Sequence, residues 1–171
     1  MNTWDAITSR RQVRDFTDEP ILAETLQQIL EAGRRAPSGR NGQPWDFVVV
    51  QDTQQLQRLS GVWQGAGWIA GAQATIALVV RTSDDEKSRL MIRFDAGQAT
   101  MQMTIAAAGL GLASGQASCA DQELAADILG FPAGHECILL IALGHPADRP
   151  LRPIVNPSRR PFDEVVHFDR W

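Results

Sequence analysis

Three arginines stand within five positions near the start of the chain, in the segment Ser9-Arg10-Arg11-Gln12-Val13-Arg14. The whole chain has a formal charge of −4, so this segment concentrates positive charge in an acidic protein. A guanidinium group presents a planar fork of N–H donors that matches the oxygens of a phosphate. The segment therefore indicates an anion-binding site, and the alternative is a solvated run of charge at a helix end.

A second polar segment, Ala36-Pro37-Ser38-Gly39-Arg40-Asn41-Gly42-Gln43-Pro44-Trp45, lies between a predicted helix and a predicted buried strand. Ten residues are generous for such a connection. Its small residues leave main-chain donors free, and loops commonly carry binding groups for that reason. We interpret the segment as a binding loop, with an ordinary turn as the alternative.

The absence of several known motifs argues against other kinds of chemistry. The stretch Gly109–Ser118 is rich in glycine, but it follows a helix and lacks the Gly-x-Gly-x-x-Gly spacing of a dinucleotide site. Neither Gly-x-Ser-x-Gly nor His-Glu-x-x-His is present, which argues against a hydrolase. The three histidines have no ligand-type spacing, so no metal site is predicted. The basic turn Pro157–Pro161 carries Arg159 and Arg160, and by itself it is typical of a solvated surface.

Periodicity predicts the elements that position these segments. Apolar residues at three- and four-residue steps predict an amphipathic helix over 22–34, and Asp121 and Gly130 bound a short helix between them. A further helix over about 94–108 has Phe94 and Met101 on one face and is apolar nearly all round, so several sides of it should be covered. Strands buried on both faces are predicted over 47–50, 75–80 and 137–143. Helices interleaved with such strands indicate an α+β or α/β fold.

Length and composition limit the possible domain number, partners and cellular compartment of the protein. A chain of 171 residues favours one domain, and its acidic balance gives no reason to expect a nucleic-acid partner. The apolar run over 74–80 is far shorter than the roughly 20 residues of a membrane span. No secretory peptide is recognised, and two isolated cysteines, Cys119 and Cys137, indicate free thiols in a reducing cytoplasm.

Residues 147–171 are rich in proline and have no regular period, yet they include Val165, Phe168 and Trp171. Such a tail cannot build a core of its own, so we expect it to lie over another surface.

In combination, these segments resemble the nitroreductase family of FMN-dependent oxidoreductases. The resemblance covers nearly the whole chain and rests on Ser9–Phe16, Ala36–Trp45, Asp95–Gly97 with Gly109–Gly111, Leu143–Pro146 and Arg159–His167. It implies an α+β fold with three α/β/α layers and a mixed, mainly antiparallel central sheet. It also implies a single domain over 1–171 in an intertwined homodimer with two FMN molecules at the interface. The tail over 147–171 would wrap the partner subunit.

The same resemblance implies site residues. Arg10 would face the phosphate end of FMN and Arg14 the pyrimidine edge, while Pro37–Asn41 would reach the flavin from the partner chain. A backbone N–H of Ser118 or Cys119 would lie near flavin N5, and no side chain is identified as an acid or base. The candidate cofactor-binding residues are Arg10, Arg11, Gln12, Arg14, Pro37, Ser38, Gly39, Asn41, Gln116, Ser118, Arg159 and Arg160.

The activity implied is hydride transfer from NADH or NADPH through flavin N5 to an electrophilic acceptor, such as a nitroaromatic or a quinone, in a ping-pong cycle. The chain departs from the usual family pattern at Gln12, Asp15 and Ser118-Cys119. These departures leave open a flavin-binding carrier or sensor, or a relative that consumes reduced flavin or dehalogenates its substrate. The chain is short for the family, so we expect an open site roofed by Trp63 or Trp68, either of which could equally belong to the core.

Overall fold

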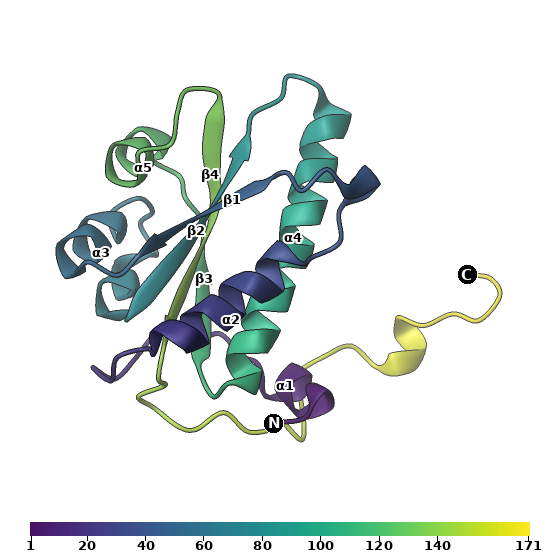
Figure 1. Cartoon of the computed structure of the whole chain (residues 1–171). Coiled ribbons are helices and arrows are strands. Elements are labelled where there is room, and N and C mark those ends of the chain that lie inside the picture. The colour runs from purple at the N-terminus through teal and green to yellow at the C-terminus, as the bar shows by residue number, and fades with distance from the viewer.

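The protein folds around one four-stranded sheet with the strand order β1-β2-β4-β3 and helices on both faces (Figure 1). A computed structural model describes all 171 residues. The elements in chain order are α1 (Thr3–Ser9), α2 (Ala23–Arg34), η1 (Gly39–Asn41), β1 (Trp45–Val50), α3 (Thr53–Leu59), η2 (Gly67–Gly71), β2 (Ala74–Arg81), α4 (Glu86–Gly109), β3 (Ala113–Ala117), α5 (Gln122–Leu129), β4 (His135–Gly144) and η3 (Phe162–Glu164).

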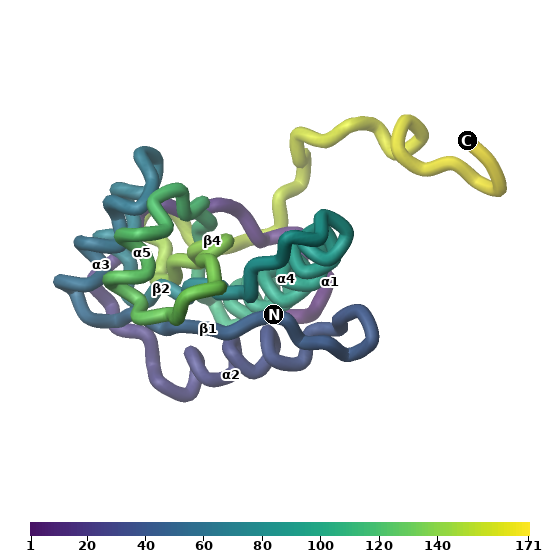
Figure 2. Tube along the Cα trace, turned by 90° about the horizontal axis from the view of Figure 1, so that it is seen from above, coloured from purple at the N-terminus to yellow at the C-terminus, as the bar shows by residue number.

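The sheet separates two hydrophobic clusters. The helices α2 and α4 cover one face, and α3 and α5 cover the other (Figures 1 and 2). Along β2, Ile76 and Leu78 point into the cluster under α2 and α4, whereas Ala77 and Val79 point into the opposite one. Successive strand side chains alternate between faces, so a strand covered on both sides must be apolar throughout. This arrangement confirms the three predicted layers.

All three strand pairings of the sheet are antiparallel, which agrees with the prediction of a mainly antiparallel sheet. β2 pairs antiparallel with β1 and β4, and β4 pairs antiparallel with β3. A single parallel bridge between Gln12 and Ser114 extends the sheet beyond β3. The prediction that all three strands are buried on both faces holds for β2, but Ile138 and Leu139 of β4 are only half-buried, and the prediction is wrong for β1. This strand lies at the edge of the sheet, and its residues Phe47, Val48 and Val49 are only half-buried.

Periodicity and capping residues correctly predict the positions of the helices α2 and α5. α2 buries Leu26, Ile29 and Gly33 on one side, as its periodicity predicts. α5 begins after Asp121, whose carboxylate accepts a hydrogen bond of 2.9 Å from the backbone N–H of Leu124. It ends at Gly130, whose φ of 72° lies in the left-handed region that favours glycine.

The long helix α4 differs from its prediction. It begins at Glu86, eight residues earlier than expected, because Asp85 caps it through hydrogen bonds to Ser88. Small residues form its core-facing side, and Ala99 is fully buried there. Phe94 and Met101, by contrast, are 64% and 42% exposed. The face that they mark therefore points away from the sheet of its own chain.

The chain after β4 has no regular structure except η3. The backbone N–H of Ile154 donates to the carbonyl oxygen of Thr8, which holds the first part of the tail against α1. Beyond this point the tail leaves the body of the molecule (yellow in Figures 1 and 2). Its wrapping around a partner subunit stays a prediction. No helix combines the length and the apolar character needed to cross a membrane.

Candidate functional site

The segment after α1 is fixed to the edge of the sheet by hydrogen bonds to β3. The backbone N–H of Val13 donates to the carbonyl oxygen of Ser114 at 3.0 Å. The amide oxygen of Gln12 accepts from the backbone N–H of Gln116 at 3.0 Å, and its amide nitrogen donates to the carbonyl oxygen of the same residue at 3.3 Å. Gln12 thus continues the ladder with its side chain and aligns the arginine segment with β3.

The crossing of these two segments requires a glycine. A Cβ atom added at Gly115 would lie 2.3 Å from the carbonyl oxygen of Val13 and 2.7 Å from the ring of Trp68. Contacts this short do not occur between real atoms, so only glycine allows the segment to approach. The sequence signal for this contact is the glycine inside the strand Ala113–Ala117.

Arg14 lies over an aromatic ring. Its guanidinium carbon is 5.9 Å from the centroid of Trp68, within the range of a cation–π interaction. The indole N–H of Trp68 donates to the carbonyl oxygen of Gly65 at 2.8 Å, and its ring lies 6.5 Å from that of Phe16. Trp68 packs against the core cluster and supports Arg14, while Trp63 is 38% exposed.

Two polar groups at the end of α1 are buried without a hydrogen-bond partner. They are the hydroxyl oxygen of Ser9 and the Nη1 nitrogen of Arg10. Buried polar groups are nearly always hydrogen-bonded, and an unpaired one costs about 1–3 kcal/mol. Hydroxyl and guanidinium groups are both donors that suit a phosphate, so these residues fit the phosphate end of FMN.

Arg11 points elsewhere. Its Nη2 nitrogen is 2.6 Å from a carboxylate oxygen of Asp148 and 2.9 Å from the carbonyl oxygen of Arg149. The hydrogen bond from Arg11 lowers the pKa of Asp148 below its usual range. Arg11 therefore holds the start of the tail through its Nη2 group.

The predicted binding loop is fastened to α4. The backbone N–H of Gly39 donates to a carboxylate oxygen of Asp95 at 3.0 Å, and the Ser38 hydroxyl accepts from the backbone N–H of Gln43 at 2.9 Å. Arg40, Asn41 and Gln43 have φ values of 53°, 57° and 46°. These left-handed conformations cost free energy in residues with a side chain and persist only where their surroundings hold them.

Asp95 is a residue whose role was not predicted. It is only 5% exposed, and its second carboxylate oxygen accepts from the amide of Gln98 at 3.2 Å. Its signal in the sequence is an acidic residue within a helix whose neighbours are small and apolar. The loop and Asp95 border a hollow of about 380 Å³ next to the first half of α4.

The arginines of the tail lie apart from Arg10 in the single chain. Arg159 donates to the carbonyl oxygen of Ser158, and Arg160 pairs with Glu164 at 3.3 Å. Both belong to the exposed segment that leaves the body of the molecule (Figure 2). The single chain thus brings Gln12 and Gln116 together and places Arg14 over Trp68, which packs at Gly115, whereas Arg159 and Arg160 lie in the exposed tail.

The loop is also remote from the arginine segment. Asp95 anchors the loop in the first half of α4, whereas α1 packs near the C-terminal end of that helix, where a Cβ added at Gly109 would lie 3.8 Å from the Cβ of Ala6. Fourteen residues of helix at about 1.5 Å each separate the two anchor points by roughly 21 Å. Within a single chain, the loop is therefore anchored far from the end of α4 that packs against α1.

Comparison with known proteins supports a common family. A profile of the Nitroreductase family matches residues 7–65 and 63–145. The FMN reductase [NAD(P)H] of Bacillus subtilis is 34% identical over 97% of this chain and 73% of its own length. The solved structure of the NADPH:FMN oxidoreductase of Vibrio harveyi in complex with NAD+ has a TM-score of 0.86 at 25% identity, covering all of this chain and 78% of that one.

A third protein shares the fold at lower identity. The FMN-dependent nitroreductase of Clostridium difficile has a TM-score of 0.83 at 23% identity, with 98% of this chain and 99% of that chain covered. The family profile covers most of the sequence, from the end of α1 to the end of β4. This chain belongs to the nitroreductase family.

Proposed function

We propose that the protein is an FMN-dependent NAD(P)H oxidoreductase that reduces an electrophilic acceptor such as a nitroaromatic or a quinone. The FMN reductase and the NADPH:FMN oxidoreductase named above support this activity. The observation that carries the proposal is the pair of buried donors at Ser9 and Arg10. No acceptor group of the protein forms a hydrogen bond with either of them. A phosphate there would complete their hydrogen bonding.

Bound FMN would supply the hydride chemistry, taking a hydride from NADH or NADPH and passing electrons to the acceptor. Arg10 and Ser9 would bind the phosphate. Arg14, held over Trp68, would place a cation at the pyrimidine edge, where it favours the form of the cofactor that carries negative charge. Gln12 would hold β3 in register, so that the backbones of Gln116 and Ser118 border the ring.

The proposed active unit is a homodimer. Monomeric proteins rarely expose large contiguous apolar patches, yet the exposed side of α4 carries Leu90, Met91, Phe94 and Met101. Leu90, Phe94 and Met101 follow one another at helical spacing, so they form one stripe. Burial of this stripe against a second copy would bring Pro37–Asn41 of one chain to the arginine segment of the other.

The tail completes the proposed assembly. Its side chains Val155, Phe168 and Trp171 are 87%, 78% and 99% exposed, and nothing in the same chain covers them. We propose that the tail lies on the partner subunit and that Arg159 or Arg160 adds a cation near the phosphate there. The two cysteines are free thiols, which fits the reducing cytoplasm that we propose as the compartment.

The activity is tested on the purified full-length protein. We expect it to be yellow, to keep FMN through dialysis, and to bleach when NADH or NADPH is added without oxygen. Addition of a quinone should then give steady NAD(P)H oxidation. Retained FMN that neither nucleotide reduces would contradict the reductase and favour a carrier, and loss of all flavin on dialysis would indicate that flavin is a passing substrate.

The assembly is tested separately by sedimentation. The wild type should sediment as a dimer, and Phe94→Asp should shift it toward the monomer because the charge would be buried at the interface. Glu24→Asp, a conservative change on the exposed side of α2, is the matched control. A wild-type protein that stays monomeric at high concentration while binding FMN would contradict the shared site.

A further inference from the structure

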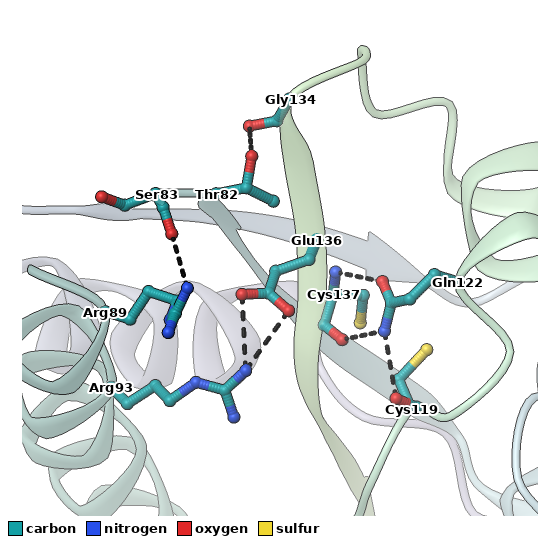
Figure 3. A network of polar contacts seen from close by, with 9 residues as sticks. All are labelled: Thr82, Ser83, Arg89, Arg93, Cys119, Gln122, Gly134, Glu136 and Cys137. Carbon is teal, nitrogen blue, oxygen red and sulfur yellow. Dashed lines mark hydrogen bonds and ion pairs between the residues drawn. The ribbon is translucent and has the colours of Figure 1, made fainter. Parts of the chain in front are cut away.

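The two cysteines of the chain lie side by side although eighteen positions separate them (Figure 3). Cys119 belongs to the turn between β3 and α5, and Cys137 is the third residue of β4. The amide nitrogen of Gln122 donates to the carbonyl oxygens of Cys119 and Cys137, at 3.0 and 2.8 Å. Its amide oxygen accepts from the backbone N–H of Cys137 at 2.9 Å. One side chain therefore holds both cysteine backbones in a fixed relation.

The two thiols differ in exposure. Cys137 is fully buried in the cluster under α3 and α5, whereas Cys119 is only half-buried at the margin of that cluster. A reagent from solvent can therefore reach Cys119 first. Cys137 lies inside the cluster against which Cys119 packs, and it is protected from the same reagent.

The two thiols also differ in pKa. A hydrogen bond with Cys137 lowers the pKa of Cys119, against the opposing effects of burial and of the Asp121 carboxylate. The same hydrogen bond, together with burial, raises the pKa of Cys137 well above its usual range. Because the thiolate is the reactive form of cysteine, Cys119 is the nucleophile and Cys137 remains a thiol.

We propose that Cys119 and Cys137 form a reversible modification site, which a hydroperoxide oxidises to an intramolecular disulfide and a small thiol reduces again. No side chain of this site is among those assigned to flavin binding. The proposal therefore does not depend on the proposed activity. Free thiols at rest agree with a reducing compartment, where protein disulfides are transient.

The oxidation proceeds in two balanced steps. The Cys119 thiolate attacks one oxygen of the peroxide, the O–O bond breaks, and the products are a sulfenic acid on Cys119 and, after protonation, water or an alcohol. The Cys137 sulfur then attacks the Cys119 sulfur, the S–S bond forms, the S–O bond breaks, and the departing hydroxide takes the Cys137 proton to give water. Two thiols lose two electrons, and the peroxide gains them.

The reverse reaction consumes two molecules of a small thiol. The first forms a mixed disulfide with one cysteine and releases the other as a thiol. The second attacks the mixed disulfide, releases the remaining cysteine and leaves the reagent as its own disulfide. The protein returns to two free thiols.

The test uses the purified full-length protein with the flavin that it retains. The protein is treated with limiting hydrogen peroxide, unfolded in a thiol-alkylating reagent and analysed by intact mass and peptide mapping. We expect alkylated cysteines to fall from two to none, a mass lower by two hydrogen atoms, and a peptide that links Cys119 to Cys137 within one chain. Dithiothreitol should restore both thiols.

Several results would overturn the proposal. They are two cysteines that remain alkylatable, oxygen atoms added to Cys119 without a linked peptide, or a disulfide that joins two chains. These results come from the wild type, so they do not depend on whether a variant folds.

Variants separate the roles of the residues. In Cys137→Ser, Cys119 should stop at the sulfenic acid, which a cyclic 1,3-diketone traps, and in Cys119→Ser the buried Cys137 should stay unreactive. Gln122→Ala removes all three hydrogen bonds that hold the cysteine backbones, so it should slow disulfide closure by at least roughly 2- to 10-fold, the factor that corresponds to one hydrogen bond. Gln28→Ala, an exposed glutamine on α2, is the matched control. Equal closure rates in Gln122→Ala and Gln28→Ala would refute the positioning by Gln122.

Discussion

Replacing Gly115 by alanine should damage the site without changing any polar group. The added Cβ would lie 2.3 Å from the carbonyl oxygen of Val13, whereas real Cβ contacts stay above 3.0 Å and are ordinary from 3.4 Å. The segment that carries Arg10 and Arg14 must therefore withdraw from β3 by 0.7 to 1.1 Å. The ring of Trp68, at 2.7 Å from the same Cβ, must move as well.

Both movements have consequences of known size. Overpacking of a well-packed region costs about 1–3 kcal/mol, and in a chain of this length each kcal/mol lowers Tm by about 2–4 °C. Displacement of positioning groups by about 1 Å can cost about 100-fold in rate. We therefore expect Gly115→Ala to lower kcat/KM and FMN affinity on the order of 10- to 100-fold.

Three measurements check this expectation: Tm with excess FMN, the Kd of FMN for the apoprotein by fluorescence quenching, and NAD(P)H oxidation with a quinone. Gly71→Ala makes the same chemical change where an added Cβ meets nothing within 4 Å, so it should behave as wild type. If Gly115→Ala matches Gly71→Ala in FMN affinity and in Tm, the close seating of the arginine segment on β3 has no role in the site.

Three further perturbations probe other contacts of the site. Arg14→Ala should weaken FMN retention and lower the FMN reduction potential by the equivalent of about 1.5–3 kcal/mol, the size of a charged hydrogen bond, and an unchanged potential would remove Arg14 from this role. Asp95→Ala leaves the Gly39 N–H unpaired and should cost about 1–3 kcal/mol of unfolding free energy, measured by urea denaturation, with weaker FMN binding as the sign that the loop has loosened. The Arg11 hydrogen bond depresses the pKa of Asp148 in the folded protein, so the stabilisation from this pair is complete above the ordinary Asp pKa of about 3.9 and disappears as pH falls through the folded value. Proteolysis of the tail should therefore increase in acid, and Asp148→Asn should show the fast cleavage already at neutral pH.

Elements with local signals could be predicted from the sequence, and elements defined by their neighbours could not. α5 lies between its predicted capping residue Asp121 and the predicted stop at Gly130, because both signals act within one turn of the helix. The half-exposure of β1 escaped prediction because an apolar run does not reveal whether its strand lies at the centre or the edge of a sheet. The start of α4 was missed because its first turns are charged and exposed.

In the site, too, features with a local sequence signal could be predicted and features that depend on distant residues could not. The arginine segment and the polar loop are recognisable as short motifs, and the structure orders both through specific hydrogen bonds. Their partners lie far away in sequence, as with Arg11 and Asp148, which are 137 positions apart. No local pattern indicates such a pairing. Trp68 is a comparable case, since the sequence alone left it open whether this residue covers the site or belongs to the core.

The geometry of one chain explains why flavin binding and dimerisation should be linked. The loop is anchored at Asp95 of α4 and α1 packs near Gly109 of the same helix, two positions roughly 21 Å apart at about 1.5 Å per residue. The same helix carries the exposed apolar stripe with Phe94 and Met101, which a second copy would cover. A ligand bound only by the dimer shifts the association equilibrium by mass action. FMN should therefore tighten the dimer, and dilution below the dimer Kd should release FMN with the same midpoint, whereas a site contained in one chain would keep its flavin on dilution.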